Sequence, residues 1–313
     1  MDCNAGDIYT MKQMSENKSG KPFGSSSHIM DNLTVSHLSS FKPELTNILY
    51  DENIVENFCS EFYDWIQTSK NNTFIGIEKF PFYAYSNGTS ESFDKFYIKN
   101  NTRRFRCFKT EYMYHQLAWR NSWPNWLFIE DSELDENDAV VISLPFSDTG
   151  NKHINHDEIL NKCDELGIPV LIDCCFAFVS KGVDFNFNHN CITDIVFSLS
   201  KTFPVSYARV GMRLTRVDDD DTLFVYQKIS YNNRFGAALG QHFINKFTPD
   251  YIVDQYKDVQ IDFCEQLNVE PSNTVFFGLG GDDWKEYSRG GPKNRLSFHK
   301  FMHDKNLKEY YGS

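Results

Sequence analysis

Short apolar segments alternate with amphipathic ones through the middle of the chain. Seven apolar runs stand out, namely Phe82–Tyr85, Phe105–Phe108, Trp126–Ile129, Ala139–Leu144, Val170–Asp173, Asp194–Leu199 and Ala208–Leu214. Several of them are apolar throughout rather than at every second residue, which is typical of strands that are covered on both faces. Strands that alternate with helices predict an α/β domain, here with a mainly parallel sheet of seven strands.

Two other segments have the spacing of amphipathic helices. Residues 52–68 place apolar side chains three and four positions apart, at Ile54, Val55, Phe58, Phe62, Trp65 and Ile66. The segment Asp157–Leu166 also has one apolar face, and it stops at Gly167 with Pro169 shortly after. Because this second helix lies between two apolar runs, we expect a strand–helix–strand unit with a right-handed crossover.

Changes in polarity along the chain predict four regions. Residues 1–30 are polar and are expected to form a flexible N-terminal arm. Residues 31–70 are expected to contribute to a small domain or to a subunit interface, and residues 71–235 to form a large domain. An acidic run at Asp218–Asp221 predicts a solvated turn. Residues 236–313 are expected to form a small C-terminal α+β domain.

Composition and charge argue against several classes of function. The net charge of −12 disfavours nucleic acid as a partner, because a phosphate backbone needs a basic surface. No apolar run approaches the roughly 20 residues that span a bilayer, and the N-terminus lacks the apolar core of a secretory signal. The eight cysteines form no Cys-x-x-Cys pair and no cluster with metal-ligand spacing. We therefore expect buried free thiols, no bound metal and a cytoplasmic protein.

Residues that can act on a ligand follow three of the predicted strands. Asp173 ends one strand, Lys201 follows another, and Gly88-Thr89-Ser90 follows a third. Ligands of open α/β sheets bind at the carboxyl ends of the strands, so these residues are expected to meet in one site. The glycine turn before a helix is also a potential anion site, although any helix can use Thr or Ser as an N-cap.

A specific motif surrounds the lysine. Ser198-Leu199-Ser200-Lys201 is followed eight residues later by Arg209 and then by Gly211, and Asp173 ends a strand upstream. Together these residues resemble the fold-type I enzymes that use pyridoxal 5′-phosphate (PLP), specifically the class I/II aminotransferases of the histidinol-phosphate aminotransferase-like branch. The resemblance extends from about residue 38 to the C-terminus. It implies the aminotransferase-like fold of PLP-dependent transferases, with PLP as the cofactor.

The resemblance also implies a role for each matching residue. Lys201 would hold the cofactor as a Schiff base, and Asp173 would keep the ring nitrogen of the cofactor protonated. The cofactor phosphate would be bound by Gly88, Thr89, Ser90, Ser198, Ser200 and Arg209.

Three further positions match the family less closely. Tyr112 resembles the aromatic residue that stacks on the pyridine ring, although an aromatic side chain can also simply pack in the core. Tyr50 resembles a tyrosine that reaches the phosphate in the neighbouring subunit. Arg295, in Asn294-Arg295-Leu296-Ser297-Phe298, resembles the arginine that binds the substrate α-carboxylate.

Two positions depart from the family pattern. Ser147 stands where the family has an asparagine that hydrogen-bonds the 3′-oxygen of the cofactor, and Phe176 stands where it has a tyrosine that bonds the same oxygen. Fewer donors make the anionic form of this oxygen less stable and favour its protonated form. The departures affect the expected reaction more than the expected fold.

The predicted function is the transfer of an amino group between an amino acid or amine and a keto acid, carried out by a homodimer with shared active sites. Two alternatives remain. The changed surroundings of the 3′-oxygen allow a PLP-dependent decarboxylase, lyase or oxidase that acts at Cα of an amino acid. A non-catalytic binding protein that retains the fold is the second, although the intact set of Lys201, Asp173 and Arg209 argues against it. The sequence identifies neither the amino donor nor the acceptor.

Overall fold

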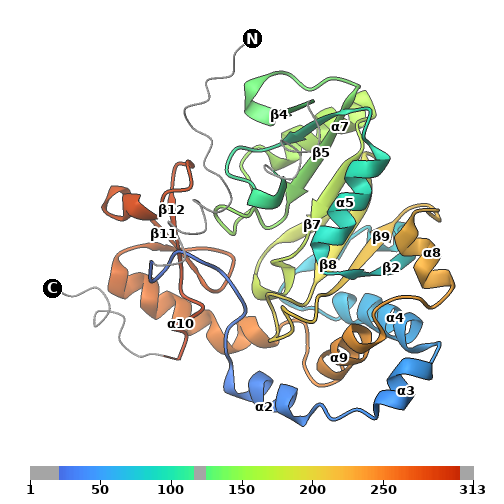
Figure 1. Ribbon diagram of the computed structural model, residues 1–313. Coiled ribbons are helices and arrows are strands. Elements are labelled where there is room, and N and C mark those ends of the chain that lie inside the picture. The colour runs from blue at the N-terminus through green and yellow to red at the C-terminus, as the bar shows by residue number, and fades with distance from the viewer. Residues whose placement is uncertain (1–20, 116–124, 304–313) are drawn as a thin grey trace.

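The computed structural model describes residues 21–115 and 125–303, and its centre is a twisted seven-stranded sheet (Figure 1). The strands follow the order β2-β9-β8-β6-β5-β3-β4. They are Phe82–Asn87 (β2), Arg104–Cys107 (β3), Trp126–Phe128 (β4), Asp138–Ser143 (β5), Val170–Asp173 (β6), Ile192–Ser198 (β8) and Val210–Thr215 (β9). β9 is antiparallel to both of its neighbours, and the other pairs in this sheet are parallel. The predicted α/β class and seven-stranded, mainly parallel sheet are confirmed, and each strand coincides with one of the seven apolar runs.

Helices cover both faces of this sheet, which explains why several of its strands are apolar throughout. Along β5, Ala139 and Val141 belong to the apolar cluster beneath helix α5 (Thr89–Lys99), whereas Val140 and Ile142 belong to the cluster beneath helix α7 (His156–Leu166). Side chains alternate between the two faces of a strand. Figure 1 accordingly shows α5 and α7 on opposite sides of the sheet.

Most of the remaining helices of this unit pack below the sheet in Figure 1, and one of them, α8 (Thr222–Lys228), lies beside β2. The others are Asn32–Ser40 (α2), Leu45–Tyr50 (α3), Ile54–Gln67 (α4) and Arg234–Ile244 (α9), with short 3₁₀ turns at Ile77–Lys79 (η2), Ile129–Asp131 (η3) and Ala177–Val179 (η4). A small parallel pair joins Thr73–Ile75 (β1) to Asp184–Asn186 (β7). None of the helices within the described part of the chain has the length and apolar character needed to cross a membrane.

A smaller unit lies beside the main sheet, and it has its own apolar core. It consists of helix α10 (Tyr251–Leu267), the 3₁₀ segment η5 (Asp282–Tyr287) and the antiparallel strands Glu270–Pro271 (β10), Phe277–Gly280 (β11) and Asn294–Ser297 (β12). Phe23 and Ile29 belong to this second core and are fully buried. Residues 21–30, which the sequence assigns to a flexible arm, are therefore packed, because the ring of Phe23 contacts those of Phe298 and Phe301. Residues 1–20 lie outside the described part.

The acidic run after β9 is an irregular connection, and two of its carboxylates are not simply solvated. Asp219 is buried and pairs with Lys99 and with the fully buried Arg213 of β9. Asp221 also pairs with Arg213, and it caps helix α8 by accepting a hydrogen bond from the backbone N–H of Leu223. The run thus holds the β9–α8 connection against the sheet.

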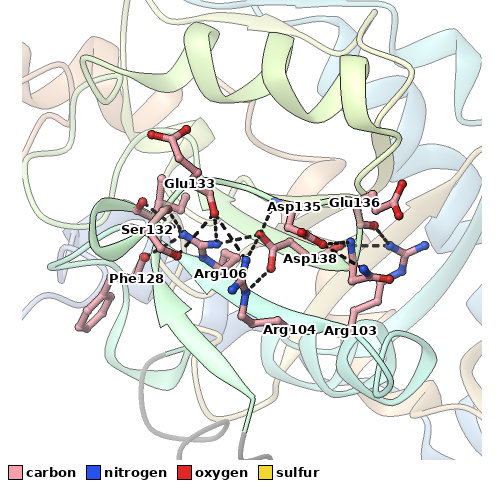
Figure 2. Close-up of polar contacts among 11 residues, drawn as sticks. Arg103, Arg104, Arg106, Phe128, Ser132, Glu133, Asp135, Glu136 and Asp138 are labelled. Atoms are coloured by element: carbon pink, nitrogen blue, oxygen red, sulfur yellow. Dashed lines mark hydrogen bonds and ion pairs between the residues drawn. The ribbon is translucent and has the colours of Figure 1, made fainter. Parts of the chain in front are cut away.

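A buried ion pair fastens the edge of the sheet (Figure 2). Arg106 in β3 and Asp138 in β5 are both fully buried, and their side chains meet at 2.7 Å. Arg104 Nε donates a second bond, of 2.6 Å, to Asp138. The guanidinium of Arg106 also donates to the backbone carbonyls of Phe128 and Glu133, at 3.1 and 3.0 Å. The connection from β4 to β5 is therefore tied to the sheet through one cation.

Candidate active site

A cavity of about 530 Å³ lies where β5, β6 and β8 end, because Ser143, Asp173 and Ser198 are the last residues of those strands and all three line it. Most of the residues predicted from the sequence line the same cavity, namely Thr89, Ser90, Tyr112, Ser147, Asp173, Phe176, Ser198, Ser200, Lys201, Arg209 and Arg295. A second cleft, of about 620 Å³, lies between the β4–β5 connection and α7 and contains none of them.

One end of the cavity has the features of an anion site. Gly88 precedes helix α5 with a φ of 72°, and any Cβ at this position would collide with the guanidinium of Arg209. The N-cap residue of α5 is Gly88, which makes no side-chain hydrogen bond to the first backbone N–H groups of the helix and so leaves room for a ligand that accepts from them. Arg209 donates a hydrogen bond of 3.1 Å to the Oγ of Ser90. A guanidinium and a helix N-terminus at one place favour the binding of a phosphate group.

Hydrogen bonds of serine hydroxyls fix the loop that carries Lys201. Ser198 Oγ donates to the carbonyl of Val210 at 3.0 Å and accepts from the backbone N–H of Ser200 at 3.1 Å. Ser206 Oγ donates to the carbonyl of Ser200 at 2.6 Å. Because the loop is tied to β9 and to itself, the position of the lysine does not depend on its own side-chain contacts.

The amine of Lys201 lies inside the cavity. Its Nζ donates a hydrogen bond of 2.7 Å to the carbonyl of Ser26 and lies 5.8 Å from the ring centre of Phe176. Burial lowers the pKa of Lys201, and the nearby cations Arg295 and Arg209 lower it further. A lower pKa increases the fraction of neutral amine, which is the nucleophilic form.

Asp173 is held at the end of β6 by residues that the sequence did not single out. Its Oδ1 accepts a hydrogen bond of 3.0 Å from the backbone N–H of Cys175, and its Oδ2 lies 4.0 Å from His115 Nε2. Burial is the main cause that raises the pKa of Asp173 to about 8, and the nearby carboxylate of Glu111 raises it further. Burial also lowers the pKa of His115 to about 3, so this imidazole is neutral.

The raised pKa of Asp173 predicts a pH dependence of stability in protein that has no ligand in the cavity. The folded state keeps the proton up to about pH 8, whereas an unfolded aspartate loses it near pH 4. Unfolding therefore releases a proton between these pH values, and the free energy of unfolding falls as the pH rises. Asp173→Asn should remove this contribution, so the variant gains stability relative to the wild type from pH 5 to pH 8. Urea titrations at several pH values measure the difference, and a constant difference would contradict the assignment.

Tyr112, Phe176 and Arg295 form further walls of the cavity. Tyr112 is 41% exposed and faces the cavity, so core packing does not account for it. Phe176 is buried and packs edge-on against Phe277 at 5.3 Å between ring centres. The guanidinium of Arg295 lies 4.3 Å from the centre of the same Phe277 ring and donates to the carbonyl of Ser147.

Two parts of the cavity wall were missed in the sequence. Gly24–Ser27 line the cavity although they belong to the predicted arm, and Arg289 lines it from the loop before β12. The sequence marks Arg289 only as part of a glycine-rich loop, six residues before Arg295. Tyr50 is the opposite case, because it lies at the end of α3, is 81% exposed and is not part of the cavity within one chain.

Comparison with known proteins identifies the fold. No model of a protein family matches the sequence, and no curated protein matches it. Many solved structures do match in three dimensions. A histidinol-phosphate aminotransferase from Clostridium acetobutylicum is similar with a TM-score of 0.60 and 17% identity, over 82% of this chain and 80% of that one.

Two other matches extend over nearly the whole chain. A probable N-succinyldiaminopimelate aminotransferase from Thermus thermophilus has a TM-score of 0.63 and 13% identity, over 93% of this chain and 95% of that one. A PLP-bound C-S lyase from Staphylococcus hominis has a TM-score of 0.61 and 8% identity, over 97% of this chain and 93% of that one. The chain therefore has the aminotransferase-like fold of PLP-dependent enzymes, as the sequence motif predicts.

Proposed function

We propose that this chain, which has the fold of the PLP-dependent aminotransferases, binds PLP and transfers an amino group between an amino acid or amine and a keto acid. The observation that carries the proposal is the convergence of Lys201, Asp173 and Arg209 on one cavity at the ends of the central strands. The end of β6 supplies Asp173, the connection between β8 and β9 supplies both Lys201 and Arg209, and each group suits a different part of PLP.

The geometry at Gly88 supports a bound phosphate. Arg209, the N-terminus of α5 and the side chain of Ser90 surround the anion end, and the absence of a Cβ at Gly88 leaves room there. Thr89, Ser198 and Ser200 would complete the phosphate site. Tyr112 would cover one face of the pyridine ring. In this arrangement the cofactor supplies an electron sink for charge that develops at Cα of the substrate.

Asp173 would hold the ring nitrogen of the cofactor. Without a ligand, burial and Glu111 favour the protonated carboxyl. A protonated pyridine nitrogen would supply the positive charge that stabilises the carboxylate instead. His115 lies 4.0 Å from Oδ2 and, being neutral, would add no second positive charge to this pair. A cationic ring nitrogen would thus favour the ionised form of Asp173, which is unfavourable in the empty cavity.

Lys201 and Arg295 would act on the substrate. Arg295 is almost fully buried and would bind the α-carboxylate with its fork of N–H donors. Lys201 would form the covalent link to PLP and, once released from it, would carry a proton from Cα, a task for which its lowered pKa is suited.

Phe176 favours a second candidate function. Its ring packs against Phe277 and offers no hydroxyl to the cavity, and Ser147 has only a short side chain at the neighbouring position. With fewer donors to the 3′-oxygen, decarboxylation, elimination or oxidation at Cα remains an alternative to transfer. A PLP-bound C-S lyase among the structures of similar fold is compatible with this alternative.

One experiment tests cofactor binding and separates these reactions. The purified protein, incubated with PLP and dialysed, should show an absorbance band near the visible edge that borohydride removes. A set of amino acids is then added in single-turnover amounts. Amino-group transfer predicts a keto acid and the aminated cofactor, whereas a lyase or decarboxylase predicts ammonia or carbon dioxide with the original band restored. The absence of any borohydride-sensitive band would refute the proposed function.

We also propose a homodimer with shared active sites. Exposed apolar side chains occur on α3 and on the connection between α8 and α9, at Leu45, Leu49, Tyr50, Ile229 and Tyr231. Arg234, the first residue of α9, donates a hydrogen bond to the carbonyl of Leu49 and so links α3 to the end of this connection. A two-fold symmetric contact would cover this surface, and it is the commonest assembly.

Sedimentation at micromolar concentration should therefore show a dimer. In that dimer Tyr50→Phe should weaken retention of PLP modestly, by about 1.5–3 kcal/mol, if Tyr50 donates a hydrogen bond to the phosphate in the other subunit. A fully active monomer that carries PLP would contradict the shared site.

A further inference from the structure

A buried glutamate lies beneath the cavity, and the proposed function gives it no direct task. Glu111 is fully buried, and it directly precedes Tyr112, which lines the cavity. Burial of a carboxylate is costly, and buried ionisable groups beside a cleft are concentrated at functional sites. Glu111 itself does not line the cavity, so any influence on a ligand must pass through its neighbours.

Neutral donors from two residues of the cavity wall point at the carboxylate of Glu111. The backbone N–H of Tyr112 donates to Oε1 at 2.7 Å, and the backbone N–H of Ser143 donates to Oε2 at 2.9 Å. Ser143 Oγ donates a third hydrogen bond, of 2.6 Å, to Oε1. Burial raises the pKa of Glu111, and these donors limit the rise because they favour the ionised form.

Ser143 is a shared neighbour of Glu111 and Asp173. It ends β5, and its register partner in β6 is Asp173, so the two side chains lie on the same face of the sheet. The hydroxyl of Ser143 is also placed to donate to Asp173, which would stabilise the ionised form of that carboxyl. A serine hydroxyl has only one proton, however, and Ser143 gives it to Glu111. Glu111 thus withholds a hydrogen-bond donor from Asp173.

The ionised form of Asp173 is poorly stabilised in the empty cavity as a result. Its Oδ1 accepts from the backbone N–H of Cys175, whereas its Oδ2 lies 4.0 Å from His115, beyond hydrogen-bond distance. Burial raises the pKa of Asp173, and the charge of Glu111 raises it further. A positive charge placed beside Asp173 would therefore gain more than it would beside a well-solvated carboxylate.

We propose that Glu111 is a positioning residue that helps to hold a proton on the ring nitrogen of PLP, because it binds the hydroxyl proton of Ser143, keeps that donor away from Asp173 and adds a second negative charge behind it. This inference rests on the proposed function and deepens the role of Asp173. A neutral side chain in place of Glu111 would free the hydroxyl of Ser143 to donate to Asp173. The ring nitrogen would then lose part of its advantage as a cation.

Equilibrium binding of two cofactors tests the assignment without turnover. Equilibrium dialysis compares PLP with its analogue in which a C–H group replaces the ring nitrogen, since this analogue cannot carry the proton. The wild type should prefer PLP. Glu111→Gln should reduce this preference roughly 10- to 100-fold, which corresponds to one hydrogen bond to a charged group.

Glu130→Gln is the matched control for the lost carboxylate. Glu130 also accepts hydrogen bonds from a backbone N–H, that of Lys109, but it lies outside the cavity of the cofactor. The preference for PLP should be unchanged in this variant.

Replacing Ser143 shows whether Glu111 acts through it. Ser143→Ala alone should leave the preference for PLP unchanged, because the hydroxyl that it removes donates to Glu111 rather than to Asp173. Added to Glu111→Gln, it should restore part of the preference, since Asp173 then no longer receives this donor. A purely structural role of Glu111 predicts instead that the second substitution adds to the loss. Ser92→Ala is the control, because it removes another buried hydroxyl outside the cavity.

The protein without cofactor provides a second measurement. The pH dependence of stability that Asp173→Asn reveals should be weaker in a Glu111→Gln background, because the carboxyl of Asp173 then loses its proton at a lower pH. Other ionisable groups that face Asp173 or Glu111 are unchanged in these variants, namely Lys201, Tyr112, Cys175, His115 and Arg289. Urea titrations at several pH values measure the difference.

Three results would overturn the proposal. They are equal affinity of the wild type for the two cofactors, a full preference for PLP in a Glu111→Gln variant that is folded by circular dichroism, and a double variant in which no part of the preference returns. Glutamine has one acceptor oxygen for three donors, and should this variant fail to fold, Ser143→Ala alone decides. A changed preference in Ser143→Ala would contradict the proposed direction of the hydrogen bond.

Failure of the proposed function gives a different result. The borohydride-sensitive band of the cofactor is recorded on the same samples. A protein that lacks this band, but in which Glu111→Gln still weakens the pH dependence of stability, would contradict PLP binding while supporting the link between Glu111 and Asp173.

Discussion

Replacing Lys201 by alanine is expected to abolish the covalent attachment of PLP. Turnover should fall by about 100-fold to 10⁴-fold, which is the range for the loss of a positioned proton-transfer group. The amine is placed for this task inside the cavity, where burial and two arginines lower its pKa. Its hydrogen bond to the carbonyl of Ser26 is replaceable, so the variant should remain folded. Borohydride treatment followed by peptide mass analysis measures the attachment, and stopped-time assays measure turnover.

A matched lysine separates this effect from a general loss of positive charge. Lys181 is exposed and lies outside the cavity, so Lys181→Ala should retain the covalent adduct and the full rate. Circular dichroism and thermal unfolding establish that both variants are folded. A borohydride-trapped adduct that persists in Lys201→Ala, at a residue of this cavity, would show that the lysine has been assigned wrongly.

The sequence predicts the central sheet well because local pattern and tertiary environment agree there. The inner strands are buried on both faces, so an apolar run such as Val170–Ile172 has one natural interpretation. The chemistry of the site follows from the same pattern. Asp173 ends one strand and Lys201 follows another, and the ends of parallel strands meet at one edge of a sheet. Their convergence could therefore be expected before the structure was known.

Residues whose position depends on distant segments were not predictable in this way. Phe23 stands in a polar stretch, and its burial depends on rings near residues 284–301. Glu111 lies beneath the site because Ser143, 32 residues later, donates two hydrogen bonds to its carboxylate. Arg289 reaches the cavity only because its loop folds over Asp148. Local spacing carries no signal for any of these contacts.

The Arg106–Asp138 pair should have the largest effect on stability. Both side chains are fully buried, and Asp138 accepts hydrogen bonds from Arg104 and Arg106 and from the backbone N–H of Asp135. Removing one partner of such a pair leaves a charge buried without compensation, which costs about 3–5 kcal/mol. In Asp138→Ala the uncompensated group is the guanidinium of Arg106, which also holds the β4–β5 connection (Figure 2).

Asp131→Ala provides a control with nearly the same geometry in a different environment. Asp131 pairs with Lys109 at 2.7 Å, the distance of the buried pair, but the two side chains are 36% and 51% exposed. Loss of an exposed pair costs about 0–1 kcal/mol. Urea unfolding should therefore separate the two variants by at least about 2 kcal/mol. Adding Arg106→Met to Asp138→Ala should recover part of the loss, because the buried charge is then absent. Equal stability of the two single variants would show that burial does not increase the contribution of the Arg106–Asp138 pair to stability. The β4–β5 connection would then be held by its backbone contacts alone.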